Sequence, residues 1–185
     1  MSLPNSGADK RDMSPYATLD DFCRVFGEDI NTLYQLSFLL TGDHAEAERC
    51  LLAGLESSFG AKYIFKDWIH SWAKRTIIQN AICELGPRSS AARFSIPAVT
   101  ALKPRNHLTE TAETSAILAL DDFDRFVFIM SVLENLSLHE CALLLTCSRQ
   151  EIRLARNRAI LRLVAAESAT HSAGLRVDDM RATNL

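Results

Sequence analysis

The residues with the most distinctive chemistry lie in a short basic segment near the end of the chain. At helical intervals after Ser148 the sequence carries Arg149, Gln150, Arg153 and Asn157. A guanidinium can bind guanine through two hydrogen bonds, and a side-chain amide can bind adenine in the same way. A helix that begins at Ser148 would also direct its positive end towards a phosphate. These residues favour contact with nucleic acid; the alternative is a solvated basic face on an ordinary three-helix unit.

The sequence around this segment predicts two short helices joined by a tight turn. Ser137 and Ser148 each precede a glutamate by three residues, the S-x-x-E signature of a capping box at a helix start. Thr146 and Cys147 predict a short turn between the two helices, and Ala142 is small where they would pack closely. Such a pair, with a basic second helix, is typical of a DNA-binding helix-turn-helix.

Apolar residues elsewhere repeat with the period of helices and nowhere with that of strands. Four helices are expected in the first half of the chain, over residues 20–26, 29–40, 44–59 and 64–85. A strongly apolar helix over 118–133, ended by Asn135 in a left-handed conformation, precedes the helix-turn-helix. We therefore predict an all-α fold.

Two helical blocks are separated by a stretch without periodicity. Gly86 and Pro87 end the first block, and residues 87–113 are rich in proline and small polar residues, too long a segment for a simple turn. We predict two small helical domains, residues 17–86 and 114–166, joined by a flexible linker over 87–113. Residues 1–16 and 167–185 are expected to be disordered tails.

The composition is that of an ordinary soluble protein, with 48% hydrophobic and 23% charged residues and a net charge of −3. Charge is segregated: residues 18–60 carry eight acids and two bases, and residues 61–105 carry eight bases and two acids. The basic stretches suit phosphate. The first residues lack the apolar core of a secretory signal, and no apolar run could span a bilayer. We expect a cytoplasmic protein without membrane insertion.

The sequence lacks the usual signatures of catalysis and of metal binding. It has no Ser-His-Asp order in a suitable context, no glycine-rich phosphate loop and no metal-ligand spacing. Its five cysteines are scattered without C-x-x-C, which disfavours disulfides and zinc. His139, Cys141 and Cys147 are close in sequence but alternate with apolar core positions, which disfavours a metal or redox site. We expect no enzyme activity, no cofactor and no metal.

The second block resembles the second DNA-binding region of sigma-70 family factors, above all of the extracytoplasmic-function subfamily. The similarity lies in LDDFDRFVF at 120–128, LENLSLHECALL at 133–144, and Ser148 through Ala159. In that family the region recognises the −35 promoter element. The resemblance implies that Ser148, Arg149, Gln150, Arg153 and Asn157 contact promoter DNA.

The first block resembles the same family's first conserved domain, which binds the clamp helices of core RNA polymerase and melts the −10 element. The matching residues are LYQL at 33–36, LLTGD at 39–43, AEAE at 45–48 and FKDWI at 65–69. The resemblance implies a DNA side with Lys74, Arg75 and Asn80, and a polymerase side with Glu46, Glu48, Arg49, Leu52 and Ala53. It also suggests an anti-sigma factor as a further partner. Trp68 and Trp72 are expected in the core rather than as stacking platforms.

The chain departs from the family pattern at positions that bear on activity. Arg49, Leu52 and Ala53 stand where family members typically have an acid, then glutamine and glutamate. An arginine facing a basic partner surface should lower both the rate and the affinity of association. The alternative is therefore a degenerate sigma-like helix-turn-helix regulator, or a protein-interaction module, that no longer activates polymerase.

Overall fold

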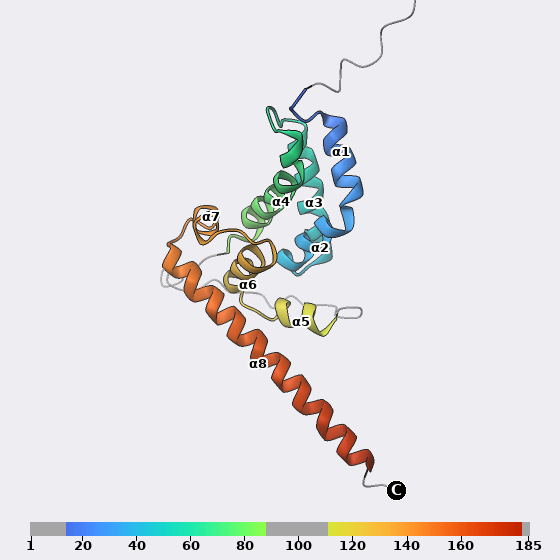
Figure 1. Cartoon of the computed structure of the whole chain (residues 1–185), viewed down its shortest axis with the longest axis vertical. Coiled ribbons are helices and arrows are strands. Elements are labelled where there is room, and N and C mark those ends of the chain that lie inside the picture. The colour runs from blue at the N-terminus through green and yellow to red at the C-terminus, as the bar shows by residue number, and fades with distance from the viewer. Residues whose placement is uncertain (1–13, 88–110, 183–185) are drawn as a thin grey trace, which may run out of the picture.

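The computed structural model describes residues 14–87 and 111–182, with side chains to residue 168. Over these residues every regular element is helical, which confirms the all-α prediction. The elements are α1 (Leu19–Glu28), α2 (Ile30–Thr41), α3 (His44–Ser58), the 3-10 turn η1 (Lys66–Trp68), α4 (Ile69–Leu85), α5 (Ala112–Leu118), α6 (Asp122–Phe128), the π-helical turn η3 (Ile129–Leu133), α7 (Leu138–Leu144) and α8 (Arg149–Ala182) (Figure 1). The predictions of a linker over 88–110 and of tails over 1–13 and 183–185 lie outside the described residues.

The first four helices pack around α2, and their ends follow the sequence signals. Thr18 and Asp43 accept backbone N–H bonds at the starts of α1 and α3. Gly42 and Gly86 end α2 and α4 with φ angles of 69° and 52°, the left-handed region that glycine adopts without a Cβ penalty. These local signals fix where the helices begin and end.

The segment before α4 is extended, and the prediction of a helix from residue 64 is wrong there. The N–H of Ala17 donates to the carbonyl of Ile64 at 2.7 Å, and the N–H of Lys66 donates to that of Pro15 at 3.0 Å. Ile64 and its aromatic neighbours favour extended pairing over helix. The described part of the predicted N-terminal tail, residues 14–16, is thereby held against the first block, with Tyr16 paired to Phe65.

The helix predicted over 118–133 is interrupted. α5 ends at Leu118, and α6 begins after Asp121, whose ψ of 145° is not helical. Acids in the first turn of α6 favour a new helix start because they oppose the partial positive charge at its N-terminus. Leu120, between the helices, is turned into the core. The predicted left-handed Asn135 is confirmed, with a φ of 56°.

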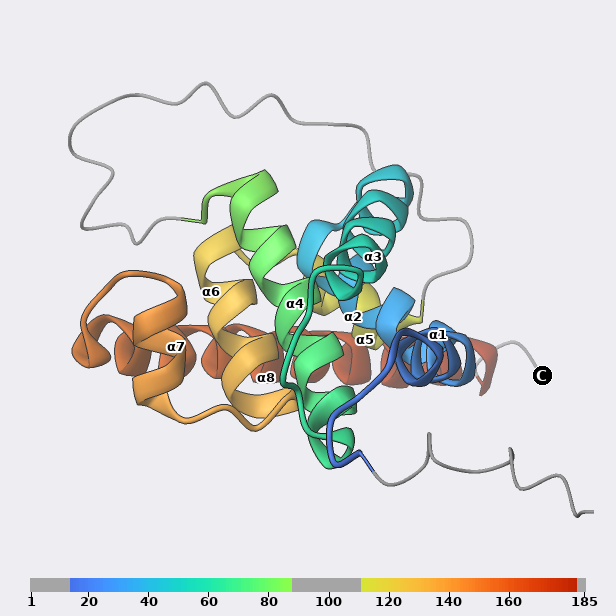
Figure 2. The same cartoon turned by 90° about the horizontal axis from the view of Figure 1, so that it is seen from above.

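The last helix extends beyond its predicted end. α8 continues as a 34-residue helix to Ala182, so the prediction of a disordered tail from residue 167 is wrong as far as Ala182. The sequence there contains alanines and no proline, and a lone glycine at 174 costs a helix only about 1 kcal/mol. α8 packs against α5, α6 and α7, and its C-terminal part leads away from the other helices in Figure 1. Seen from above, it crosses behind α6 and α7 (Figure 2).

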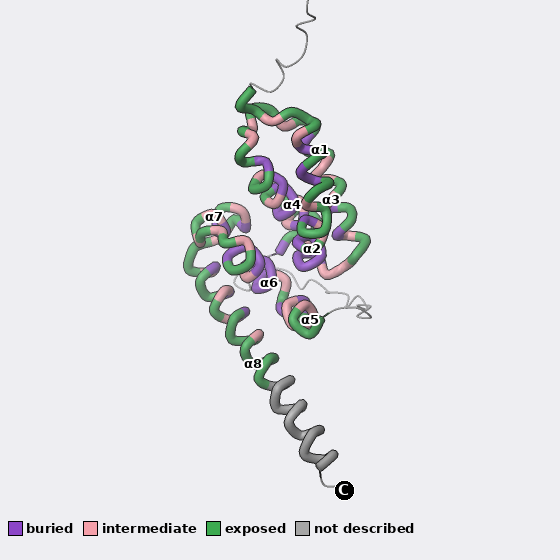
Figure 3. Tube along the Cα trace, turned by 45° about the vertical axis from the view of Figure 1, so that its right-hand side comes forward, coloured by how far each residue is buried: buried purple, intermediate pink, exposed green. Residues whose placement is uncertain are grey.

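The two helical blocks share one core, so the separation into two domains with a linker is not confirmed. Leu118 of α5 is buried with Phe38 and Ala47 of the first block. Side chains of α2, α4, α6 and α8 belong to one continuous buried cluster. Figure 3 shows the buried positions of α2, α4 and α6 gathered at the centre of the molecule.

Arg125 makes the most deeply buried polar contact between the blocks. Its side chain is 1% exposed, and its Nε and Nη2 donate to the carbonyl of Leu40 at 3.3 and 3.1 Å. Leu40 lies in the last turn of α2, where carbonyls lack partners within the helix and carry a partial negative charge. Asp122 lies 2.9 Å from the same guanidinium and balances its charge. Arg125 therefore joins α6 to the C-terminal end of α2.

Replacing Arg125 with methionine should destabilise the protein markedly. Arg125→Met keeps the apolar stem but leaves the buried Leu40 carbonyl without its charged donor, at a cost of about 2 kcal/mol. Urea unfolding followed by circular dichroism measures this. The control Arg24→Met removes an exposed arginine paired to Asp21 and should cost little. An Arg125→Met variant as stable as the wild type would contradict the role given to this contact.

Candidate nucleic-acid interface

α7 and α8 form the predicted helix-turn-helix, and both predicted capping boxes are present. The N–H of Glu140 donates to Ser137 Oγ at 3.2 Å, and the N–H of Ser137 donates back to Glu140 Oε2 at 2.9 Å. Ser148 and Glu151 repeat the pattern at 3.2 and 2.9 Å. Hydrogen bonds from Ser137 lower the pKa of Glu140, which keeps its carboxylate charged. Each serine thus fixes the start of one helix.

The turn between the two helices depends on a threonine in a left-handed conformation. Thr146 has a φ of 51°, its N–H donates to the carbonyl of Leu143, and the N–H of Cys147 donates to that of Ala142 at 3.0 Å. This pair of bonds is the Schellman motif, in which the left-handed position is usually glycine. A β-branched residue there is strained. The turn sets the angle at which α8 leaves α7.

One side of α8 is buried against the core, and the opposite side is exposed. Ile152, Ala155 and Ala159 are 0% exposed and pack against the core. The predicted contact residues lie on the opposite side, and all of them are exposed: Ser148, Arg149, Gln150, Arg153 and Asn157. The structure brings these polar side chains onto one accessible surface. Their role in binding DNA is a prediction that the geometry leaves open.

The later arginines of α8 have a structural role. Arg158 binds Asp124 with two bonds of 3.1 and 2.6 Å, and Arg162 lies 2.6 Å from Asp121. The Asp124 side chain is only 3% exposed, and the bond to it raises the pKa of Arg158. The arginines of α8 therefore form two groups. Arg149 and Arg153 near the turn point outward, and Arg158 and Arg162 hold α8 to α6.

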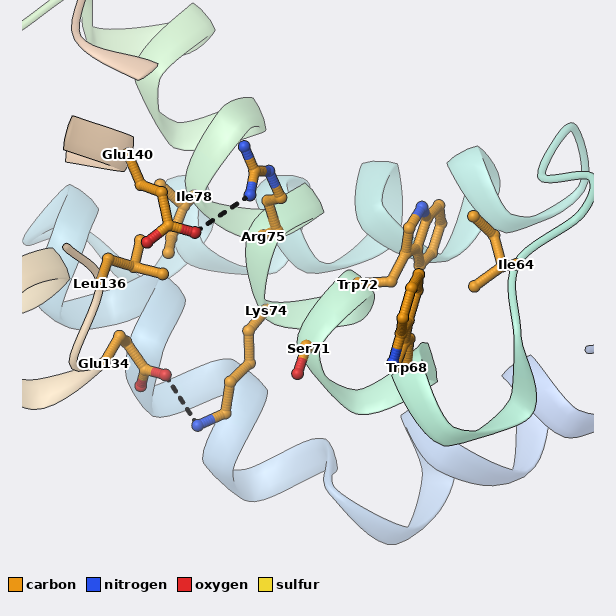
Figure 4. A pocket seen from close by; sticks show the side chains of 10 residues that line it. All are labelled: Ile64, Trp68, Ser71, Trp72, Lys74, Arg75, Ile78, Glu134, Leu136 and Glu140. Carbon is orange, nitrogen blue, oxygen red and sulfur yellow. Dashed lines mark hydrogen bonds and ion pairs between the residues drawn. The ribbon is translucent and has the colours of Figure 1, made fainter. Parts of the chain in front are cut away.

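Of the three predicted DNA-side residues of α4, Lys74 and Arg75 face the second block. Lys74 Nζ lies 2.7 Å from Glu134 Oε2, and Arg75 Nη1 lies 3.7 Å from Glu140 Oε1 (Figure 4). Asn80 is turned towards α3, where its amide donates to the carbonyl of Cys50 at 3.5 Å. The structure thus places Lys74 and Arg75 on one surface and Asn80 on another.

A pocket between the two blocks is the feature that the sequence did not predict. Its volume is about 460 Å³, and its lining residues are Ile64, Trp68, Ser71, Trp72, Lys74, Arg75, Ile78, Glu134, Leu136 and Glu140. Trp72 is half-buried, with its ring centroid 4.9 Å from that of Phe22, so it packs against the core as predicted but is only partly enclosed by it. Trp68 is 63% exposed, so the prediction that it lies in the core is wrong. Its ring packs edge-on against the exposed Phe65, the extended residue before η1.

The predicted polymerase-side residues lie on α3. Glu48, Arg49 and Leu52 are exposed, and Glu46 and Ala53 are half-buried. Arg49 lies 3.8 Å from Glu46, one turn back on the same helix. The side chain of Leu52 is 60% exposed, an apolar group in water beside a charged pair. The residues that depart from the family pattern therefore sit on an accessible surface.

No protein-family model matches this chain, and no curated protein matches it.

Within residues 14–87 and 111–182, none of the helices combines the length and the apolar character needed to cross a membrane. The same part of the chain holds no group of three His, Cys, Asp or Glu residues suited to a metal ion. The five cysteines are free thiols, and burial raises the pKa of Cys141 to about 11, so this thiol is unreactive at neutral pH.

Glycine in place of Thr146 should stabilise the helix-turn-helix. Relief of the left-handed strain is worth about 1–2 kcal/mol, and the greater freedom of glycine in the unfolded chain costs about 0.5–1 kcal/mol. Thr146→Gly should therefore gain about 1 kcal/mol in urea unfolding. The control Thr146→Ala keeps a Cβ at the same φ and should show no gain. Equal stability of the two variants would contradict the strain at this turn.

Proposed function

We propose that this chain is a divergent sigma-like factor that binds promoter DNA through α7 and α8 and directs core RNA polymerase to it. The main support is the single exposed surface of α8 that carries Arg149, Gln150, Arg153 and Asn157 opposite a fully buried stripe. The ordered similarity of both blocks to the sigma-70 family supports the wider role in transcription initiation.

The proposed chemistry is direct contact with base edges in the major groove. Arg149 and Arg153 can each pair with a guanine, and Gln150 and Asn157 with adenines. Leu154, which is 51% exposed among them, suits contact with a thymine methyl group. Glu151 would repel phosphates, but its carboxylate accepts bonds from Ser148 N–H and Oγ at 2.9 and 2.8 Å, which ties it to the cap.

Loss of one outward arginine should weaken specific binding and relax sequence preference. The full chain is first used to select sites from a random-sequence duplex library, and the selected duplex is then titrated with Arg149→Ala and Arg153→Ala. Each variant should bind about 10- to 100-fold more weakly, because a bidentate arginine–guanine contact contributes about 1–3 kcal/mol. Arg24→Ala, an exposed arginine on α1, should bind like the wild type. Failure of the wild type to select any sequence contradicts the proposal.

The second candidate is a sigma-like regulator that has lost polymerase activation. The exposed Arg49 and Leu52 favour it, since they replace residues of the family's polymerase surface. In this account α8 still binds DNA, and the chain acts at its site without recruiting polymerase.

A triple substitution on α3 separates the two candidates. Arg49→Asp, Leu52→Gln and Ala53→Glu together restore the family pattern. We expect the wild type to bind purified core RNA polymerase in a pull-down, and the triple variant to bind it more tightly, because Arg49 would no longer face a basic surface. Binding by the triple variant alone favours the degenerate regulator. Binding by neither protein removes polymerase from the account.

A further inference from the structure

The cations that α4 would offer to DNA already lie against carboxylates of the same chain. Lys74 Nζ is 2.7 Å from Glu134, whose side chain is 15% exposed. Arg75 Nη1 is 3.7 Å from Glu140, and both of these side chains are close to half exposed. Glu134 directly follows η3, and Glu140 lies in the first turn of α7. Two neighbouring cations thus meet two anions that lie about 60 residues away in sequence.

The backbone of Glu134 and the carboxylate of Glu140 are held in place by their own local structure. The N–H of Glu134 donates to the carbonyl of Ile129 at 2.9 Å, at the end of η3. Glu140 accepts the Ser137 N–H and hydroxyl on Oε2, at 2.9 and 2.7 Å, which leaves Oε1 towards Arg75. Because these contacts lie within the 129–140 segment, the Glu134 backbone and the Glu140 carboxylate keep their positions without help from α4.

The same segment lines the pocket that also contains the aromatic side chains of η1 and α4. Leu136, between the two glutamates, lines the pocket with Trp68 and Trp72 (Figure 4). Aromatic rings beside Lys74 and Arg75 would suit a single strand, because bases stack on rings while cations neutralise phosphates. In this structure the second block forms one wall of that pocket and pairs with both cations.

We infer that residues 134–140 are an autoinhibitory latch, whose carboxylates compete with nucleic acid for Lys74 and Arg75 on α4. The inference rests on the proposed function and concerns the regulation of its first block. Partly exposed ion pairs contribute little stability and are screened by salt, so the latch can be displaced. The Arg125–Leu40 contact lies outside it and is buried, so the blocks stay joined while the segment moves away from α4.

The test neutralises the latch and leaves its structure in place. The double variant Glu134→Gln, Glu140→Gln keeps both side-chain shapes, and glutamine can also complete the capping box with Ser137. It is made in the Arg149→Ala, Arg153→Ala background, so that α8 contributes little to the readout. The control, Glu56→Gln with Glu113→Gln, changes the net charge equally at exposed sites on α3 and α5.

The latch variant should bind a fluorescently labelled single-stranded oligonucleotide of random sequence about fivefold more tightly than its parent. This change is in the range of typical intramolecular couplings. The charge control should stay within about twofold of its parent. Equal affinities of the latch and control variants overturn the competition. Absence of oligonucleotide binding by every variant overturns it too, while duplex selection by α8 remains the separate test of the proposed function.

Opening of the latch can be measured without nucleic acid. The chain has two tryptophans, and both line the pocket, so acrylamide quenching of their fluorescence reports access to it. Quenching should be greater in the latch variant than in the control, and salt should raise it in the parent but not in the latch variant. Identical quenching of all three proteins at every salt concentration overturns the latch.

Discussion

The arrangement of the molecule depends on one buried guanidinium at a helix end. Arg125 lies between the blocks and donates to the carbonyl of Leu40. This carbonyl is in the last turn of α2, so no N–H of the helix is placed to donate to it. Burying an arginine is costly unless its charge is balanced and hydrogen-bonded; here Asp122 balances the charge, and that carbonyl accepts from Nε and Nη2. The contact places α6 beside α2, and α6 in turn carries the carboxylates that hold α8. The surface that α8 presents therefore follows from a contact made far from it.

Charge in this protein serves two purposes that the sequence alone does not separate. On α8, the arginines near the turn are exposed, whereas Arg158 and Arg162 are bound to α6. On α4, Lys74 and Arg75 are accessible only in part and lie against glutamates. The number of basic residues in a sequence stretch therefore overestimates the positive charge available on the surface, because the fold places carboxylates next to some of those residues. Arg149 and Arg153 form a small outward patch at the start of α8.

The parts of the fold that the sequence predicted depend on neighbours three or four residues apart. Ser137 and Ser148 cap helices through bonds to their own third neighbours, and Asn135 ends one through its own left-handed backbone. The buried stripe of α8 follows from its period, and so does the exposure of Arg149 opposite it. Two of the errors arise where distant segments meet. Pairing of Tyr16 with Phe65 shortens α4, and the pocket around Trp68 needs both blocks, which no local pattern encodes.

The central claim is that the outward surface of α8 enters a DNA groove, and the salt dependence of duplex binding tests it most directly. Each neutralised phosphate contributes about −0.9 to the slope of log K against log salt concentration. Because the capped start of α8 and its arginines would lie in a groove lined by phosphates, the affinity should fall as salt rises, and replacing both guanine-reading arginines with alanine should lower it at every salt concentration. A duplex affinity that does not change with salt, or no duplex binding in dilute buffer, would contradict the account.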